Sequence, residues 1–137
     1  MQSGVRTFLL ISYFAVVTFC GSAPAFPQAN IRSIAIKNGE TVELGLVYWI
    51  VNCKSIVVGS PEVEVLEGPP ELSLSIKEGM VLPRAQNCAK PVPGGTLLAT
   101  AKDVTENKRA KLTYRVKYKT KDGERQGSSV YNVALFP

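Results

Sequence analysis

Apolar and polar residues alternate along most of the chain after residue 30. The isoleucines of segment 31–36 lead into Lys37-Asn38-Gly39-Glu40, and apolar residues then occupy every second position: Val42, Leu44, Leu46, Tyr48 and Ile50. A period of two places alternate side chains on opposite faces of a strand. Asn-Gly between two strands favours a type I′ turn, because both residues tolerate a positive φ. The pattern predicts a β-hairpin over residues 31–50.

A second hairpin is predicted at the end of the chain. Apolar residues from Ala110 to Tyr118 alternate with polar ones, the turn signal is Lys121-Asp122-Gly123, and segment 129–135 alternates again. One face of this hairpin should therefore be apolar and the other basic. The basic residues of the first strand are Lys111, Arg115, Lys117 and Lys119.

Between the hairpins the alternating runs are shorter. They cover residues 63–65, 72–76 and 97–101, and a loop rich in Pro and Gly extends from Met80 to Gly95. No segment has the period of a helix. About seven short strands with frequent turn signals predict an all-β fold, a single antiparallel β-sandwich.

The first 25 residues differ from the rest. Arg6 is their only charged side chain, residues 8–20 form an apolar run of 13, and Ala23-Pro24-Ala25 resembles a cleavage site. The run is short of the roughly 20 residues that cross a bilayer. This order predicts a signal peptide over residues 1–25 and a domain over residues 26–137. A buried core helix is the alternative for the run, and lipidation is the alternative fate of Cys20, although Phe19 is not the small residue that lipoprotein signals place before the cysteine.

The leader predicts a secreted or periplasmic product without a transmembrane segment in the mature chain. A bacterial origin fits the compact leader and the lack of any Asn-x-Ser/Thr site. After removal of the leader two cysteines remain, Cys53 and Cys88, and an oxidising compartment favours a disulfide between them. That bond would close a loop of 36 residues and stabilise the fold by roughly 4 kcal/mol. A redox pair or a zinc site would need closer spacing or further ligands.

The order and spacing of the strands resemble an immunoglobulin-like or fibronectin type III-like domain over most of residues 30–136. The closing hairpin is similar to the last two strands of that fold, with Tyr114 at the place of the strand-F tyrosine. Cys88 and Trp49 depart from the antibody pattern: Cys88 lies in a loop, Val116 replaces the second cysteine, and Trp49 ends the second predicted strand. The resemblance implies a sandwich but not the antibody subfamily.

The residue inventory argues against an enzyme. The chain has no histidine and only two aspartates, Asp103 and Asp122, so the commonest general base and metal ligand is lacking. The glutamates at 62, 64 and 67 lack the oxygen-rich loop of a calcium site. Gly94-Gly95 does not form a phosphate-binding pattern. We expect no catalytic residues, no metal site and no cofactor.

The mature chain carries 15 Lys and Arg against 11 Asp and Glu, a net charge of +4. Much of the excess positive charge lies in residues 102–125, which hold nine cations and four anions. The face of Lys111, Arg115, Lys117 and Lys119 is either a solvated surface paired with glutamates across the sheet or a surface for an anionic partner. No nucleic acid is expected, because no aromatic residues interleave with these cations.

Trp49 suggests another contact. Val47, Trp49 and Val51 should point away from the face of Tyr48, so the end of this strand is apolar on both faces and needs a cover. The cover is either the proline-rich loop or a partner, or a second copy, that contacts Trp49, Pro91 and Pro93.

These features together predict an exported, non-catalytic binding module with a basic strand face and a disulfide-held loop. The expected partners are an envelope protein or an anionic surface polymer, and self-association is a further option. The alternatives are a secreted protease inhibitor, since a rigid proline-rich loop can enter an active-site cleft at low entropy cost, and a structural component of the cell envelope.

Overall fold

The structure, a computed structural model, describes Gly21 and residues 31–137. All regular secondary structure in this part of the chain is β, as predicted, and none of it is helix. The predicted signal peptide lies outside the described residues except for Gly21. No helix long and apolar enough to cross a membrane is found in the described part.

The strands are β1 (Arg32–Lys37), β2 (Thr41–Val47), β3 (Ile50–Val51), β4 (Lys54–Ser55), β5 (Glu62–Glu67), β6 (Leu72–Val81), β7 (Val92–Ala101), β8 (Lys108–Thr120) and β9 (Gly123–Phe136).

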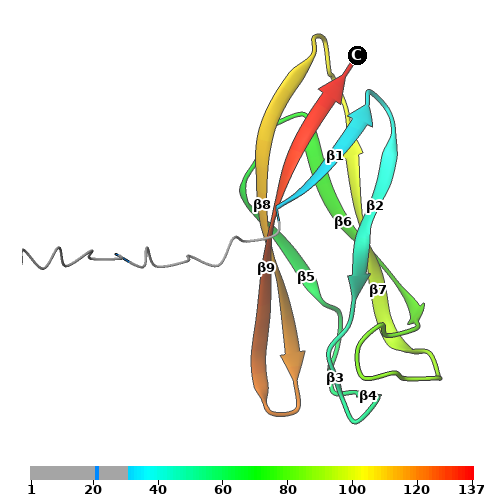
Figure 1. Ribbon diagram of the computed structural model, residues 1–137. Coiled ribbons are helices and arrows are strands. Elements are labelled where there is room, and N and C mark those ends of the chain that lie inside the picture. Colours follow the sequence, from blue (N-terminus) through cyan, green and yellow to red (C-terminus); the bar gives the residue numbers. More distant parts are fainter. Residues whose placement is uncertain (1–20, 22–30) are drawn as a thin grey trace, which may run out of the picture.

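The strands form two main sheets (Figure 1). One has the order β1-β9-β8-β5, and the other has the order β2-β7-β6. β1 runs parallel to β9, whereas the other pairs within these sheets are antiparallel. β3 and β4 make a separate small hairpin at one end.

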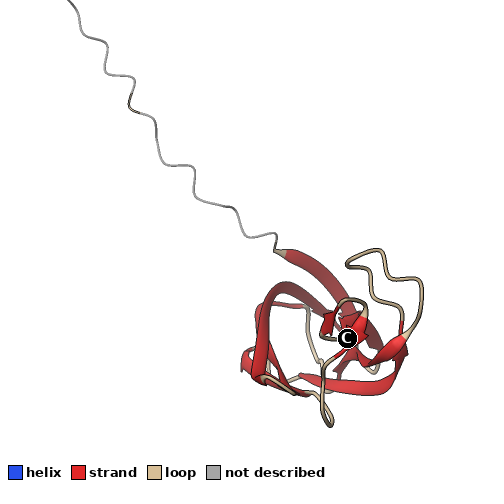
Figure 2. Ribbon diagram, turned by 90° about the horizontal axis from the view of Figure 1, so that it is seen from below, coloured by secondary structure: helices blue, strands red, loops and turns tan. Residues whose placement is uncertain are grey.

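Both sheets contribute to one hydrophobic core, and the end-on view shows them enclosing a common interior (Figure 2). β1, β8 and β9 supply its most buried large side chains, while β2, β6 and β7 close it from the other side. The most buried are Ile36, Leu112, Val133 and Leu135. A shared core of this kind binds the two sheets into one folding unit.

The structure confirms the closing hairpin. β8 and β9 pair without a register shift from Lys108–Leu135 to Thr120–Gly123, so Lys121 and Asp122 form a two-residue loop. Leu112, Tyr114, Val116 and Tyr118 are buried, and the basic residues between them are not. Period-two alternation therefore identified both the pairing and the buried face.

The predicted first hairpin is wrong. β1 and β2 lie in different sheets, and residues 38–40 carry the chain from one to the other. The Glu40 amide donates to the Lys37 carbonyl at 2.9 Å, and only Gly39 has a positive φ, of 80°, which is the pattern of a type II turn. A type I′ pair occurs instead between β3 and β4, where Asn52 and Cys53 have φ of 49° and 60°. The Asn-Gly signal located a turn, but burial in the shared core decided which strands pair.

The predicted apolar face of β2 is also wrong beyond Leu44. The pairing of β2 with β7 shifts between Glu43 and Gly45, so Leu44 is an extra residue in a β-bulge. After the bulge Val47 is buried, while Leu46 and Tyr48 point away from the core centre and are half-buried. A one-residue shift exchanges the two faces of a strand.

The Pro/Gly loop is shorter than predicted. β6 continues to Val81 and β7 begins at Val92, so the loop spans only 82–91, and Pro93, Gly94 and Gly95 are part of a strand. Glycine is required there by close packing. A Cβ on Gly94 would clash with the Val47 carbonyl oxygen, and one on Gly95 would lie 2.7 Å from Ile76 Cγ2.

Candidate binding groove between two free strand edges

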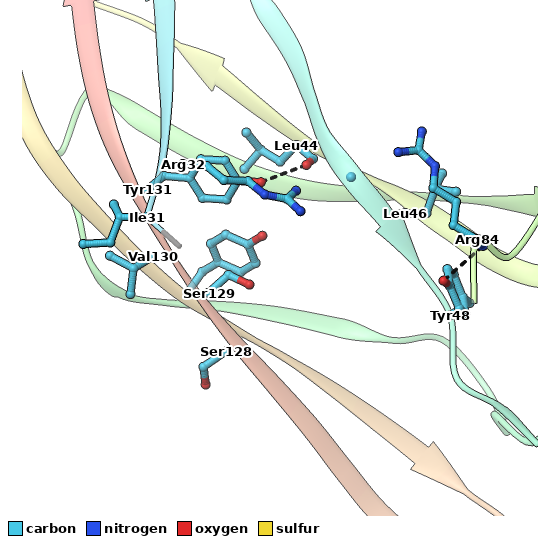
Figure 3. A pocket seen from close by; sticks show the side chains of 12 residues that line it. Ile31, Arg32, Leu44, Leu46, Tyr48, Arg84, Ser128, Ser129, Val130 and Tyr131 are labelled. Carbon is cyan, nitrogen blue, oxygen red and sulfur yellow. Dashed lines mark hydrogen bonds between the residues drawn. The ribbon is translucent and has the colours of Figure 1, made fainter. Parts of the chain in front are cut away.

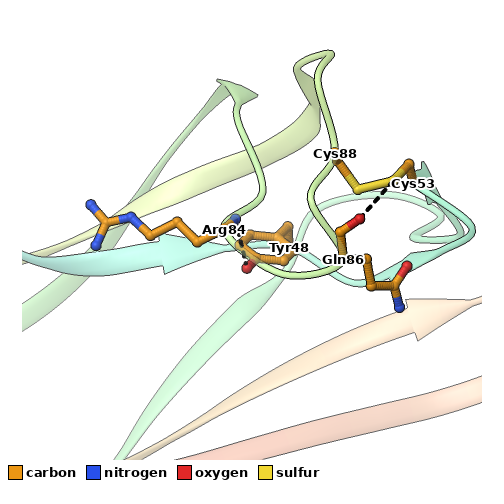
Figure 4. Close-up of a disulfide and its surroundings, with 5 residues drawn as sticks. All are labelled: Tyr48, Cys53, Arg84, Gln86 and Cys88. Atoms are coloured by element: carbon orange, nitrogen blue, oxygen red, sulfur yellow. Dashed lines mark hydrogen bonds between the residues drawn. A yellow bond between two sulfur atoms is a disulfide. The ribbon is translucent and has the colours of Figure 1, made fainter.

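The disulfide predicted between Cys53 and Cys88 is formed, with Cα atoms 5.5 Å apart (Figure 4). It joins the turn between β3 and β4 to the loop 82–91. Gln86 and Asn87, just before Cys88, have positive φ of 59° and 50°. This conformation costs a residue such as Gln86 roughly 1–2 kcal/mol, whereas asparagine adopts it more readily.

The tethered loop covers the end of β2. The Arg84 amide donates a hydrogen bond to Tyr48 Oη at 3.2 Å (Figure 4), and Pro83 beside it is buried. The ring of Trp49 is covered differently: it lies 5.4 Å from the Tyr118 ring of β8 at a tilt of 58°. The loop thus meets Tyr48, and β8 meets Trp49. Pro91 and Pro93 are exposed, and Trp49 is half-buried.

The basic residues of β8 lie on the outer face of the four-stranded sheet, with carboxylates beside them. On β5, Glu62 stands opposite Lys117 and Glu64 opposite Arg115. On β9, Glu124 stands opposite Lys119. Lys117 Nζ lies 3.2 Å from Glu64 Oε2. Three carboxylates thus flank the four cations, which lowers the net charge of this face.

A cavity opens where two strand edges lack neighbours among the residues that the structure describes. β1 pairs with residues 131–136 of β9, so residues 123–130 have β8 on one side and no described strand on the other. β2 likewise pairs with β7 alone. Between these edges lie a cavity of about 540 Å³ and a smaller one of about 150 Å³, which share five lining residues. The shared residues are Gly45, Leu46, Tyr114, Ser128 and Ser129. We call the two cavities together the groove.

One end of the groove is closed by aromatic side chains. Tyr131 Oη donates a buried hydrogen bond of 3.0 Å to the Leu44 carbonyl, which links β9 to β2 (Figure 3). The Tyr114 ring stacks on Tyr131 with centroids 6.0 Å apart. Burial raises the pKa of Tyr114, and burial followed by the neighbouring tyrosines raises that of Tyr118 to about 12. Both hydroxyls are therefore protonated at neutral pH.

The inner part of the groove is incompletely filled. Gly127 of β9 lies opposite Val116 of β8, and Gly45 lies on β2 across the smaller cavity. A Cβ on either glycine would meet no other atom within 4 Å. Glycine within a strand often marks a place where a ligand or another backbone approaches closely. Val47, Leu97 and Val116 make the inner wall apolar.

The mouth of the groove is basic. Arg32 lies on the β1–β9 side and Arg84, from the disulfide-held loop, on the β2 side (Figure 3). Both are exposed, and neither forms a salt bridge within the described residues. The groove is lined by no carboxylate, and the first acidic residue of the whole sequence is Glu40. Two arginine forks without internal partners can bind an anion.

Sequence reasoning singled out neither arginine, because nothing in their local sequence distinguishes them. One signal was present: the inward positions 125, 127 and 129 of β9 are Arg, Gly and Ser, where an apolar pattern would place large residues.

No group of three or more metal-binding side chains exists in the described part of the chain. Comparison of the chain with protein-family models, curated proteins and solved structures finds no match.

Proposed function

We propose that the chain is an exported, non-catalytic binding module of the immunoglobulin-like class, and that it binds an anionic ligand in the groove. Export rests on the leader-like residues 1–25. The binding role rests on one observation: among the described residues, Arg32 and Arg84 form no salt bridge and line an open cavity between two strand edges that have no neighbour.

The strand order supports the immunoglobulin-like class. In that fold the strands B, E and D are neighbours in one sheet, and C, F and G are neighbours in the other. Here β2-β7-β6 corresponds to B-E-D, and β9-β8-β5 corresponds to G-F-C. β1 takes the place of strand A in chain order, but it pairs with the last strand and not with β2, which is a departure from the A-B-E-D sheet. The disulfide departs from the family, since it joins two loops at one end.

The chemistry of the groove favours a carboxylate or phosphate group. Guanidinium groups bind these anions through two parallel hydrogen bonds, and the Tyr48 and Ser129 hydroxyls add polar contacts at the mouth. The apolar inner wall can at the same time accommodate an aliphatic or aromatic part of the ligand. A ligand with one anionic group and an adjoining apolar part would contact both the arginines at the mouth and the apolar inner wall.

An NMR titration tests the proposal. Inorganic phosphate and butyrate serve as probes, and we expect saturable amide shifts at Arg32, Ser129 and Tyr131. Arg32→Gln and Arg84→Gln should each weaken binding by about fivefold to tenfold. Lys117→Gln is the matched control, because Lys117 is equally cationic but already paired with Glu64.

The same titration tests the outer basic face. If the shifts cluster on Lys111, Arg115 and Lys119, and Lys117→Gln weakens binding while the arginine variants do not, the anionic partner binds the outer face of the sheet. In that case the groove is not the binding site.

A further inference from the structure

We propose that the ligand is an extended, acidic peptide segment of a partner protein, which adds as a strand to the free edge of β9 at residues 124–130. This inference rests on the proposed binding role of the groove and specifies its ligand. Three independent features of the groove support it: an unpaired backbone edge, an unfilled interior and an unpaired positive charge.

The first feature is the edge itself. β9 is continuous over 14 residues and keeps its register with β8 throughout, yet only residues 131–136 have β1 on the other side. Along residues 124–130 about half of the backbone N–H and C=O groups point toward β8, and the others point outward. Proteins usually protect such edges with proline, bulges or inward-pointing charges. Arg125 is an inward-pointing charge near the turn, but the rest of this edge, Gly127 to Val130, carries none of these devices.

The second feature is the missing side-chain volume. A strand beside β9 would direct every second side chain toward the core. Those side chains would enter the space that Gly45 and Gly127 leave open, beside Val116 and Leu97. The smaller cavity alone measures about 150 Å³, and an apolar cavity of about this size in another protein holds a benzene molecule. Valine or isoleucine side chains of an added strand would fill it.

The third feature is charge, which selects the occupant. Arg32 and Arg84 favour a carboxylate on the added strand. Residues 26–30 of this chain contain none. The acidic strand of a second copy, β5, already pairs with β8, and its Glu64 already contacts Lys117. A partner segment that alternates β-branched and polar residues and carries glutamate or aspartate fits best. Strand addition of this kind takes affinity from the backbone and specificity from alternate side chains.

The test uses the chain as the cell exports it and a synthetic probe, acetyl-Thr-Val-Glu-Val-Thr-Val-Glu-amide. Calorimetry measures its affinity, and hydrogen exchange measures protection of the amides of residues 124–130. We expect the peptide to slow exchange within 124–130. Replacing both glutamates by lysine should weaken binding at least about tenfold. N-methylation of alternate peptide bonds should abolish binding, because it removes the backbone hydrogen bonds.

Two glycine variants separate the groove from the rest of the surface. A Cβ on Gly127 would meet open space, so Gly127→Val should fill part of the groove and reduce peptide affinity at least about tenfold while leaving the melting temperature equal or higher. Gly79→Val makes the same change on β6, at a position where a Cβ also meets no atom within 4 Å and which lines neither part of the groove, and should leave the affinity unchanged. Equal affinity in both variants would overturn strand addition.

The remaining outcomes identify a different occupant or a different mode. If phosphate binds in the groove but the N-methylated peptide binds as well as the parent, strand addition is wrong and the proposed function stands. If neither phosphate nor peptide perturbs the groove, both proposals fail. A concentration-dependent dimer that Gly127→Val dissociates would make a second copy the occupant. Protection of residues 124–130 without peptide, lost on deletion of residues 26–30, would make that segment the occupant. Either result overturns the partner proposal.

Discussion

The two halves of β9, residues 123–130 and residues 131–136, differ in how many strands they pair with. Both halves pair with β8, and the second half also pairs with β1. Residues 131–136 lie between β1 and β8, and their inward side chains, Tyr131, Val133 and Leu135, are at most 4% exposed. Residues 123–130 have β8 as their one described neighbour, and their inward positions hold Arg125, Gly127 and Ser129, all exposed.

This difference shows that side-chain choice follows the number of neighbours rather than the strand itself. Opposite both halves, β8 continues to present large apolar residues: Leu112 faces Tyr131, whereas Val116 faces Gly127. The first half of β9 therefore contributes no large apolar side chain to this part of the core, although Val116 and Tyr118 of β8 are themselves buried there. Stability should reside in the half that is packed on both sides, and binding in the half that is open.

The largest expected effect comes from removing the disulfide, which holds Arg84 at the open half. The double variant Cys53→Ser, Cys88→Ser should lower the free energy of unfolding by about 4 kcal/mol, measured by urea denaturation. The amide of Arg84 should lose its protection from exchange, while the amides of residues 131–136 keep theirs below the unfolding transition. Uniform loss of protection in both halves would contradict the comparison.

A matched pair of truncations compares the halves directly. Leu135→Ala removes a fully buried side chain and should destabilise the protein by about 3 kcal/mol. Ser129→Ala, at an exposed inward position of the open half, should change stability by less than about 0.5 kcal/mol. The denaturation midpoints of the two variants, measured in the same buffer, give the two losses of stability. Equal losses of stability would show that the open half is packed as closely as the other half.

Glycine replacement sharpens the comparison. Gly95→Val would place its Cβ 2.7 Å from Ile76 Cγ2, so overpacking should cost about 1–3 kcal/mol. Gly127→Val meets open space and should stabilise the protein by about 0.5 kcal/mol, since glycine is unfavourable in a strand. Thermal melts of the two variants should shift in opposite directions. A destabilised Gly127→Val would mean that the groove is narrower than described.

The smallest effect concerns the ionisation of Tyr118, which lies at the inner wall of the groove. Its pKa is raised to about 12 by burial, then by the neighbouring tyrosines, so the folded state holds this proton more tightly than the unfolded state. The contribution of Tyr118 to stability should be constant below pH 10, near the unfolded pKa, and should fall as the pH rises from 10 to 12. The difference in urea midpoint between the protein and Tyr118→Phe isolates this contribution. Phenolate absorbance should include a component near pH 12 that Tyr118→Phe removes.

Local patterns predicted some of this architecture and missed other parts for identifiable reasons. The β8–β9 hairpin could be predicted because its alternation is uninterrupted and its turn is short. The first hairpin could not be excluded, because Asn38-Gly39 specifies a turn but not the partner of each strand. The bulge at Leu44 left no distinct signature in the sequence, so Leu46 and Tyr48 were assigned to the wrong face.

The candidate site was less predictable than the fold. The disulfide-held loop was identified, but its contribution to the groove, Arg84, was not. Arg32 and Arg84 are 52 residues apart, and only the return of the chain across two sheets brings them to one cavity. Lys111, Arg115, Lys117 and Lys119 were conspicuous in the sequence because they lie on one strand, yet three carboxylates from β5 and β9 stand opposite or beside them.

By itself the sequence determined the β class, the closing hairpin, the basic outer face and the pairing of two cysteines, because each depends on short-range periodicity or on a count of residues. Tertiary structure alone decided which strands share a sheet, where β1 begins along β9, and which charges meet. The physical reason is that pairing and burial depend on neighbours distant in the chain, and the open groove exists only where such a neighbour is lacking.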